Sequence, residues 1–364
     1  MRNSYRPRRG SVSGFARKGY CLFLAICMVL GACKSDPSAK ESWKEIYAQA
    51  DRAYAQGDFV GSVALADRAA QRAREQQGDT SLAFAKAATL AGAAHLALAQ
   101  YTEAQLSFEQ ALPSIVSSPG SSAEDRSTAY NNLAEAYREQ GRYDRALTLY
   151  QQALASVEAA YAADSREVAD ATAALALAYH SQGELDRAEA LYRSALGILD
   201  REGFADSDLS SLLGNMADLM WRLDRLEEAE SIALRALAIE TRELGPEHPS
   251  VAGYFNTLGV IYDQGKRYDR ALESYGRALA IRQAALGPDH PSVATTHSNI
   301  AVTCEALKRY EQAEAHFVQA ISIFESIPAR QSDARANRRA LAAMYRATNR
   351  PAKAEAVEAP LSKS

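Results

Sequence analysis

The sequence has little of what marks a β-rich or disulfide-bonded protein. Its 364 residues include only 4 cysteines and 11 prolines, and 8% of them are aromatic. No alternating run of β-branched residues between turn formers stands out, so strands have little support. Ala, Leu, Glu, Gln and Arg are abundant instead, and these residues favour helices. The composition therefore predicts an all-α fold.

Motifs of catalysis and cofactor binding are missing as well. The sequence has no glycine-rich nucleotide-binding loop, no Cys-x-x-Cys pair, no His-Glu-x-x-His and no Gly-x-Ser-x-Gly. His297 and His316 have no acidic or cysteine partner at motif spacing, and His248 and His290 lack the further donors that a metal site needs. We therefore expect no enzyme activity, no metal and no cofactor.

The cations at the amino terminus stand apart from a chain that is otherwise acidic. The net charge is −4, and the first 20 residues hold no acid but six cations, which are Arg2, Arg6, Arg8, Arg9, Arg17 and Lys18. Without these six, the net charge would be −4 − 6 = −10. An acidic chain argues against nucleic acid as a partner and against broad adhesion to anionic lipid.

A short apolar run, CLFLAICMVLGAC at residues 21–33, follows these cations. As a helix it would span roughly 20 Å, short of the ~30 Å hydrocarbon core, so we interpret it as the hydrophobic region of a signal peptide. Its end, Leu30-Gly31-Ala32-Cys33, resembles the lipobox of bacterial lipoproteins. That resemblance implies cleavage of residues 1–32 and palmitate-type acylation together with diacylglycerol at Cys33. The alternative is an ordinary secretory signal in which Cys33 has no role.

Lipidation of Cys33 would determine which cysteines remain in the mature protein and where in the cell the protein lies. Cys21 and Cys27 would leave with the signal peptide, so Cys304 could form no intrachain disulfide. Residues 33–44 would be the lipidated cysteine and a flexible tether. By resemblance to the sorting rule of Gram-negative lipoproteins, Lys34 in place of Asp implies the inner leaflet of the outer membrane, facing the periplasm.

Internal repetition is the strongest feature of the remaining chain. The segments NNLAEAYREQGRYDRALTLYQQAL (131–154) and NTLGVIYDQGKRYDRALESYGRAL (256–279) place small, large, turn-forming and aromatic residues in the same order. One alanine recurs at spacings of 42, 42, 41, 42, 42 and 41 residues, and Ser62 extends the series backwards: Ala104, Ala146, Ala188, Ala229, Ala271, Ala313 and Ala354. Constant spacing over this length indicates a repeat architecture.

The residue classes within one repeat predict two antiparallel helices. Ala134, Ala146 and Ala153 are small where the helices would cross closely, and larger apolar residues at i, i+3 and i+4 surround them. Gly141 can adopt φ > 0 where the first helix ends. One such hairpin cannot bury both its faces, so each must stack on the next.

This pattern resembles the tetratricopeptide repeat (TPR), in the long-period form of kinesin light chains, over about residues 41–358. The resemblance implies a right-handed solenoid at residues 45–358, with about seven full repeats, a terminal capping helix pair and a disordered tail at 359–364. Within it, the nonapeptides LGPEHPSVA (244–252) and LGPDHPSVA (286–294) are predicted connectors. In each, glycine would end one long helix and proline would begin the next. Cys304 occupies a tyrosine position and should be a buried, inert thiol.

In TPR proteins, the first helix of each repeat lines a concave groove that holds protein or peptide partners. Asparagines before the small residue often bind the partner's backbone, but here the series is incomplete, because Ala48, Leu90, Ala174, Thr257 and Ala340 occupy the same position elsewhere. The alternative is that these asparagines bridge helices or bind water. The candidate partner-binding residues are Asn131, Asn132, Glu135, Asn215, Asp218, Trp221, Asn256 and Asn299, with Arg138, Arg222, Asp263 and Glu305 beside them.

These inferences predict a membrane-anchored periplasmic TPR lipoprotein that acts as a scaffold or adaptor. By family resemblance its task would be the assembly of secretion, pilus, outer-membrane or cell-wall machinery. The alternative is a regulatory adaptor that activates, or delivers substrates to, an envelope protease or cell-wall enzyme. In both cases the partners are proteins or peptides and, through the lipid on Cys33, the membrane.

Overall fold

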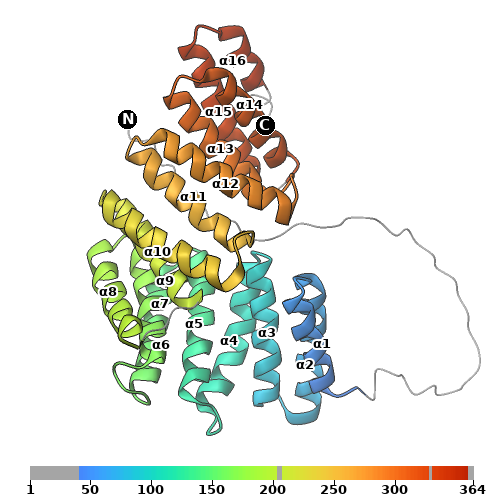
Figure 1. The fold of residues 1–364 in the computed structure, drawn as a ribbon. Helices are drawn as coiled ribbons and strands as arrows, with labels where there is room; N and C mark the ends of the chain where they lie inside the picture. The colour runs from blue at the N-terminus through green and yellow to red at the C-terminus, as the bar shows by residue number, and fades with distance from the viewer. Residues whose placement is uncertain (1–40, 203–206, 328–329, 360–364) are drawn as a thin grey trace, which may run out of the picture. The chain divides into compact units, whose positions relative to one another are not determined.

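The computed structural model describes residues 41–202, 207–327 and 330–359. In these residues it contains sixteen α-helices and no strand, as the sequence predicts (Figure 1). No helix in this part of the chain is both long and apolar enough to cross a membrane. The expected signal peptide (1–32), Cys33 and most of the tether lie outside the described residues, and so does the tail from residue 360.

The helices fall into two compact units, residues 1–191 and 192–364, and the division lies within α8. Before it come α1 (Trp43–Ala55), α2 (Phe59–Gln77), α3 (Leu82–Ala97), α4 (Tyr101–Ser117), α5 (Ala123–Glu139), α6 (Tyr143–Glu158) and α7 (Arg166–Gln182), and α8 itself is Leu185–Glu202. After it come α9 (Ser207–Arg222), α10 (Leu226–Leu244), α11 (Pro249–Gln264), α12 (Tyr268–Leu286), α13 (Pro291–Ala306), α14 (Tyr310–Glu325), α15 (Gln331–Ala347) and α16 (Pro351–Glu358).

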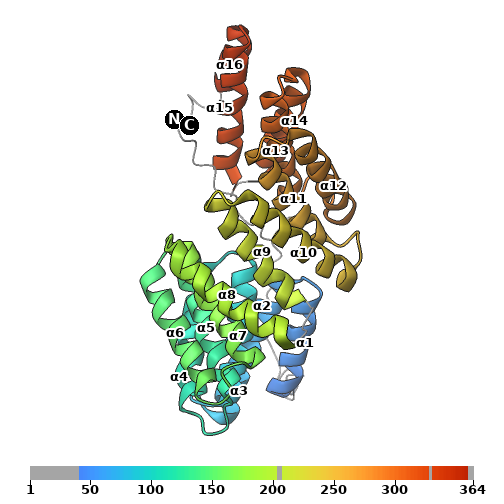
Figure 2. The same ribbon diagram turned by 60° about the vertical axis from the view of Figure 1, so that its left-hand side comes forward.

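Within each unit consecutive helices pack against one another, from α1 to α7 in the first and from α9 to α16 in the second (Figure 1 and Figure 2). We call the odd-numbered helices A helices and the even-numbered ones B helices. The seven pairs α1–α2 to α13–α14 match the seven predicted repeats, and α15–α16 is the predicted terminal pair. Helix α1 begins two residues before the expected solenoid start at 45, because Ser42 and Glu45 form a capping box.

The repeating alanine marks the closest approach inside each pair. Ala146, Ala229 and Ala313 are fully buried, and Ser62 fills the same place while its hydroxyl donates to the Ala50 carbonyl at 3.0 Å. Near this crossing, an aromatic ring of the B helix packs on a small residue of the A helix. At Gly259 the packing is so close that an added Cβ would lie 2.4 Å from the Tyr275 ring.

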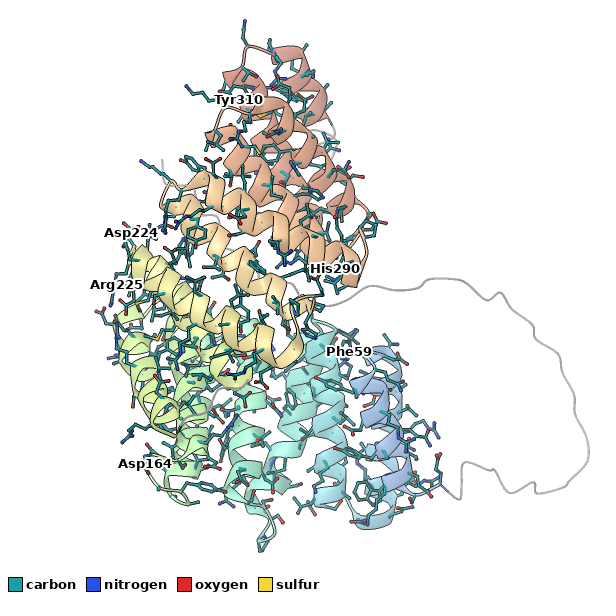
Figure 3. All side chains as sticks on the ribbon, in the orientation of Figure 1. Phe59, Asp164, Asp224, Arg225, His290 and Tyr310 are labelled. Carbon is teal, nitrogen blue, oxygen red and sulfur yellow. The ribbon has the colours of Figure 1, made fainter. Side chains whose placement is uncertain are left out.

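The turn inside each pair contains one residue in the left-handed backbone region. Gly141 has φ of +75°, as expected, and Gly57 and Gly183 are equivalent to it. In the other five pairs of the described chain a non-glycine residue adopts this conformation: Ala99, Asp224, Lys266, Lys308 and Asn349, of which Asp224 is labelled in Figure 3. Left-handed backbone costs such residues about 1 kcal/mol. The packing of the pair therefore outweighs the local backbone preference at these turns.

The nonapeptides are connectors between pairs, as predicted. Gly245 and Gly287 end α10 and α12 with φ of +85°, and the prolines begin α11 and α13. The histidine before each proline is the helix N-cap. Nδ1 of His290, labelled in Figure 3, accepts a hydrogen bond of 3.1 Å from the Ser292 backbone, and His248 does the same at 3.3 Å.

Candidate functional site

The candidate residues lie on A helices of both units. Asn131, Asn132 and Glu135 lie on α5 in unit 1. The others lie in unit 2: Asn215, Asp218 and Trp221 on α9, Asn256 on α11 and Asn299 on α13. Helix α11 contacts both α9 and α13, so the A helices of unit 2 are neighbours.

On α5, Glu135 is largely engaged by its own unit. The Arg138 guanidinium donates to both of its oxygens, at 3.0 and 2.5 Å, and the Tyr150 hydroxyl donates at 2.9 Å. Burial, and then the charge of Glu135, raises the pKa of Tyr150 above its usual range. Asn131 Oδ1 is buried and accepts no hydrogen bond from the described residues. Asn132 is half-buried and has no buried unpartnered polar atom, so on this helix it is better placed to bind a partner than Asn131 or Glu135 is.

On α9, Asp218 pairs with Arg222 at 3.2 Å, and both side chains are about one third exposed. Pairs of this kind contribute little to stability, in the range of about 0–1 kcal/mol. The Trp221 ring is half-buried, and its indole N–H is buried without an acceptor among the described residues. Trp221 therefore presents part of its ring, and not its polar edge, to the surface.

Two hydrogen bonds connect α11 to α13. The Asn299 amide donates to Asn256 Oδ1 at 3.0 Å, and the Thr303 hydroxyl donates to Asp263 Oδ1 at 2.6 Å. For Asn256 and Asn299 the bridging role left open by the sequence is therefore observed. The pair still leaves the Asn256 amide hydrogens and the Asn299 Oδ1 without a partner in the described chain, so donor and acceptor remain available beside each other.

Next to these amides lie two valines and two acids. We define the A-face by six residues of unit 2, none of which is buried: Asn256, Val260 and Asp263 of α11, and Asn299, Val302 and Glu305 of α13. Val302 is 46% exposed. Val260 and Val302 are 42 residues apart, as are Asp263 and Glu305, so the same position of successive repeats carries the same chemistry. The two valines are not among the residues predicted from the sequence, although their spacing of 42 residues could have identified them.

The two acids of the A-face differ from Glu230 and Glu314 of the B helices in forming no ion pair within 4 Å in the described chain. Burial raises the pKa of Glu305, and burial also raises the pKa of Asp263 despite its hydrogen bond from Thr303. On the B helices, by contrast, Glu230 contacts Arg267 at 2.5 Å, and Glu314 contacts Arg350 at 2.9 Å and Lys353 at 2.8 Å. The A-face is therefore a partly desolvated acidic surface without internal compensation.

A pair of histidines lies away from the A-face, between α13 and α14. Nδ1 of His297 and Nδ1 of His316 are 2.8 Å apart, so one ring donates and the other accepts. Burial, with a smaller contribution from His316, lowers the pKa of His297 to about 4, and burial lowers the pKa of His316. Cys304 is 2% exposed, which agrees with the expected buried thiol. The described residues contain no group of three or more His, Cys, Asp or Glu side chains that could hold a metal ion.

Comparison with protein families agrees with this repeat architecture. A tetratricopeptide repeat family model matches residues 125–201, 208–284, 264–326 and 292–358, and a second one matches residues 89–156. Together these matches cover well over half of the chain. The chain belongs to the tetratricopeptide repeat family. Its helix pairs are TPRs, and the A-face is formed by the A helices of two successive TPRs.

Solved structures share this fold at low sequence identity. BtubC (BKLC) from P. vanneervenii is 21% identical, with a TM-score of 0.50 over 68% of this chain and 94% of that one. Aspartyl phosphate phosphatase F from Bacillus subtilis is 15% identical, with a TM-score of 0.58 over 82% and 74%. A Signal Transduction ATPase with Numerous Domains (STAND) protein with a tetratricopeptide repeat sensor, from Pyrococcus horikoshii, is 17% identical, with a TM-score of 0.59 over 83% and 46%. A search of the curated proteins found no match. At these identities the likeness concerns the TPR fold alone.

Proposed function

We propose that this TPR protein is a scaffold or adaptor that binds other proteins through the exposed sides of its A helices. The observation that carries the proposal is the A-face, where amide, valine and carboxylate side chains lie together on two packed helices. An amide offers both a donor and an acceptor and can pair with an extended backbone whatever its sequence. Asn132 of α5 extends the same proposal to unit 1.

Cross-linking from the two sides of one TPR tests this proposal. A photo-reactive residue on the A-face is expected to capture a partner protein in cells, and one on the B helix of the same TPR is not. Equal capture from both sides would reject the A helices as the binding surface.

We also propose that the protein works in the bacterial envelope, held by lipid on Cys33 in the inner leaflet of the outer membrane. The support is the amino-terminal sequence, in which six cations precede a short apolar run that ends in the lipobox-like Leu30-Gly31-Ala32-Cys33. Multiple acyl chains would make this attachment stable, since each buried CH₂ contributes about 0.8 kcal/mol.

Replacing Cys33 with serine is expected to abolish lipid labelling, because serine has no thiol to accept the diacylglycerol. The measurement is incorporation of an alkynyl palmitate in cells, followed by separation of membrane and soluble fractions. Cys304→Ser is the matched control and should label normally, since that thiol is buried. Labelling of the Cys33→Ser protein at the level of the unaltered chain would disprove the lipoprotein assignment.

A further inference from the structure

We propose that the A-face of unit 2 binds an extended segment of a partner protein that carries lysine or arginine. The inference rests on the proposed binding function and adds the chemical class of the partner. Three groups of A-face residues specify the segment. They are the amides, the valines and the unpaired acids.

The amides specify an extended backbone. Asn299 and Asn256 hold each other through one hydrogen bond of 3.0 Å, which fixes the orientation of both side chains. This bond leaves the amide hydrogens of Asn256 as donors and Oδ1 of Asn299 as an acceptor. A peptide group of an extended segment presents the complementary acceptor and donor.

The valines specify a partly apolar segment. Val302 is 46% exposed, and Val260 is partly exposed at the equivalent position of the preceding TPR. Two branched side chains on neighbouring helices form a small apolar surface between the amides and the acids. Covering this surface with alternate side chains of an extended segment removes it from water.

The acids specify the charge. Asp263 and Glu305 are partly desolvated, and neither carboxylate has a cation within 4 Å in the described chain, whereas Glu230 and Glu314 each have two. A desolvated carboxylate gains most from an added cation, because the interaction between the charges is less screened there. A lysine or arginine of the partner would supply to the A-face the compensation that arginines of this chain supply to the B helices.

The experiment measures the binding of three labelled octapeptides to the full chain by fluorescence anisotropy. The peptides alternate valine with lysine, with glutamate or with threonine, so that the alternate side chains are positive, negative or uncharged. We expect the lysine peptide to bind about tenfold or more tightly than the other two, and its affinity to fall with added salt. The variant Asp263→Asn with Glu305→Gln should weaken lysine-peptide binding by about tenfold or more.

The control is Glu273→Gln with Glu311→Gln, which removes the same charge from two exposed sites on the B helices α12 and α14. This variant should bind the lysine peptide as the unaltered chain does. Glu305→Gln alone should retain the fold, because Glu305 bonds to no other described residue, and should still weaken binding. Circular dichroism verifies the fold of every variant.

Several outcomes overturn the inference. Equal loss in the control variant would assign the binding to net charge. Equal binding of the three peptides would overturn the charge selectivity, and with it the inference. Failure of all three peptides to bind would also overturn it, and the scaffold proposal would then stand or fall by the cross-linking result, which needs no chosen peptide.

Discussion

A Gly259→Val substitution is expected to lower the free energy of unfolding of unit 2 by about 3 kcal/mol, at the upper end of the usual cost of overpacking a core. An added Cβ would lie 2.4 and 2.5 Å from two ring atoms of Tyr275, closer than real side chains approach each other. The ring cannot easily yield, because Tyr275 is only 2% exposed. Two helices of the TPR would have to separate to admit the side chain.

The same substitution at Gly253 is the matched control. Gly253 lies in the same helix, and an added Cβ there would meet nothing within 4 Å. Glycine and valine differ by only a few tenths of a kcal/mol in helix propensity, so Gly253→Val should change stability by about 0.5 kcal/mol or less. The chain has two tryptophans, Trp43 in unit 1 and Trp221 in unit 2. In a Trp43→Phe background, Trp221 fluorescence during urea unfolding therefore reports unit 2. Equal midpoints for the two valine variants would contradict the close packing at Gly259.

Lowering the pH from 7 to 4.5 is expected to destabilise unit 2 through His297 and His316. Their pKa values are depressed in the folded state, that of His297 to about 4, because burial disfavours the charged rings. Above the ordinary pKa of 6.5 the folded and unfolded states are both neutral, and the pair has no effect on stability. Below it the unfolded chain binds protons that the folded chain does not bind until about pH 4. The free energy of unfolding therefore falls across this window, by up to roughly 3 kcal/mol for His297.

The hydrogen bond between the rings explains why the folded chain resists protonation. Nδ1 of one ring donates to Nδ1 of the other over 2.8 Å, so a proton added to the acceptor would leave two donors facing each other. The variant His297→Gln with His316→Gln removes both groups. Urea unfolding at pH 7 and at pH 4.5 should then show a smaller pH dependence for the variant than for the unaltered chain. An identical pH dependence for the two proteins would exclude the histidine pair as its source.

The sequence predicts the helix pairs well because one physical requirement repeats at fixed spacing. Wherever two helices cross closely, only a small residue fits, and the alanine series records that position along the chain. Proline and glycine likewise identify the connector between α10 and α11, because each has one backbone property that the connector needs. The spacing gives no sign of the division into two units within α8. The sequence also does not predict the left-handed backbone at Asp224 and Lys266, because packing there overrides the local backbone preference.

The candidate site was only partly accessible from the sequence. The family position of the asparagines identifies Asn299, and Asn256 lies next to the equivalent position of the preceding repeat, which Thr257 occupies. That the two asparagines bond to each other depends on the distance between two helices, which spacing does not give. Likewise, Glu135 has the residue type of a ligand group, and only the structure shows that Arg138 and Tyr150 engage it. Within the described chain, Asp263 and Glu305 lack an ion pair because of the side chains that the fold places around them, which the identity of the two residues does not reveal.

The central claim is that partners bind the A-helix side of the TPRs, and two valines of one TPR test it most directly. Val302 on α13 and Val318 on α14 are almost equally exposed, at 46% and 48%, but only Val302 belongs to the A-face. A photo-cross-linking amino acid is placed at each position in the full chain in cells, and the captured peptides are sequenced by mass spectrometry. The account predicts capture from position 302, with lysine or arginine in the captured segments, and little or none from position 318. Capture from 318 that equals or exceeds capture from 302 would contradict it.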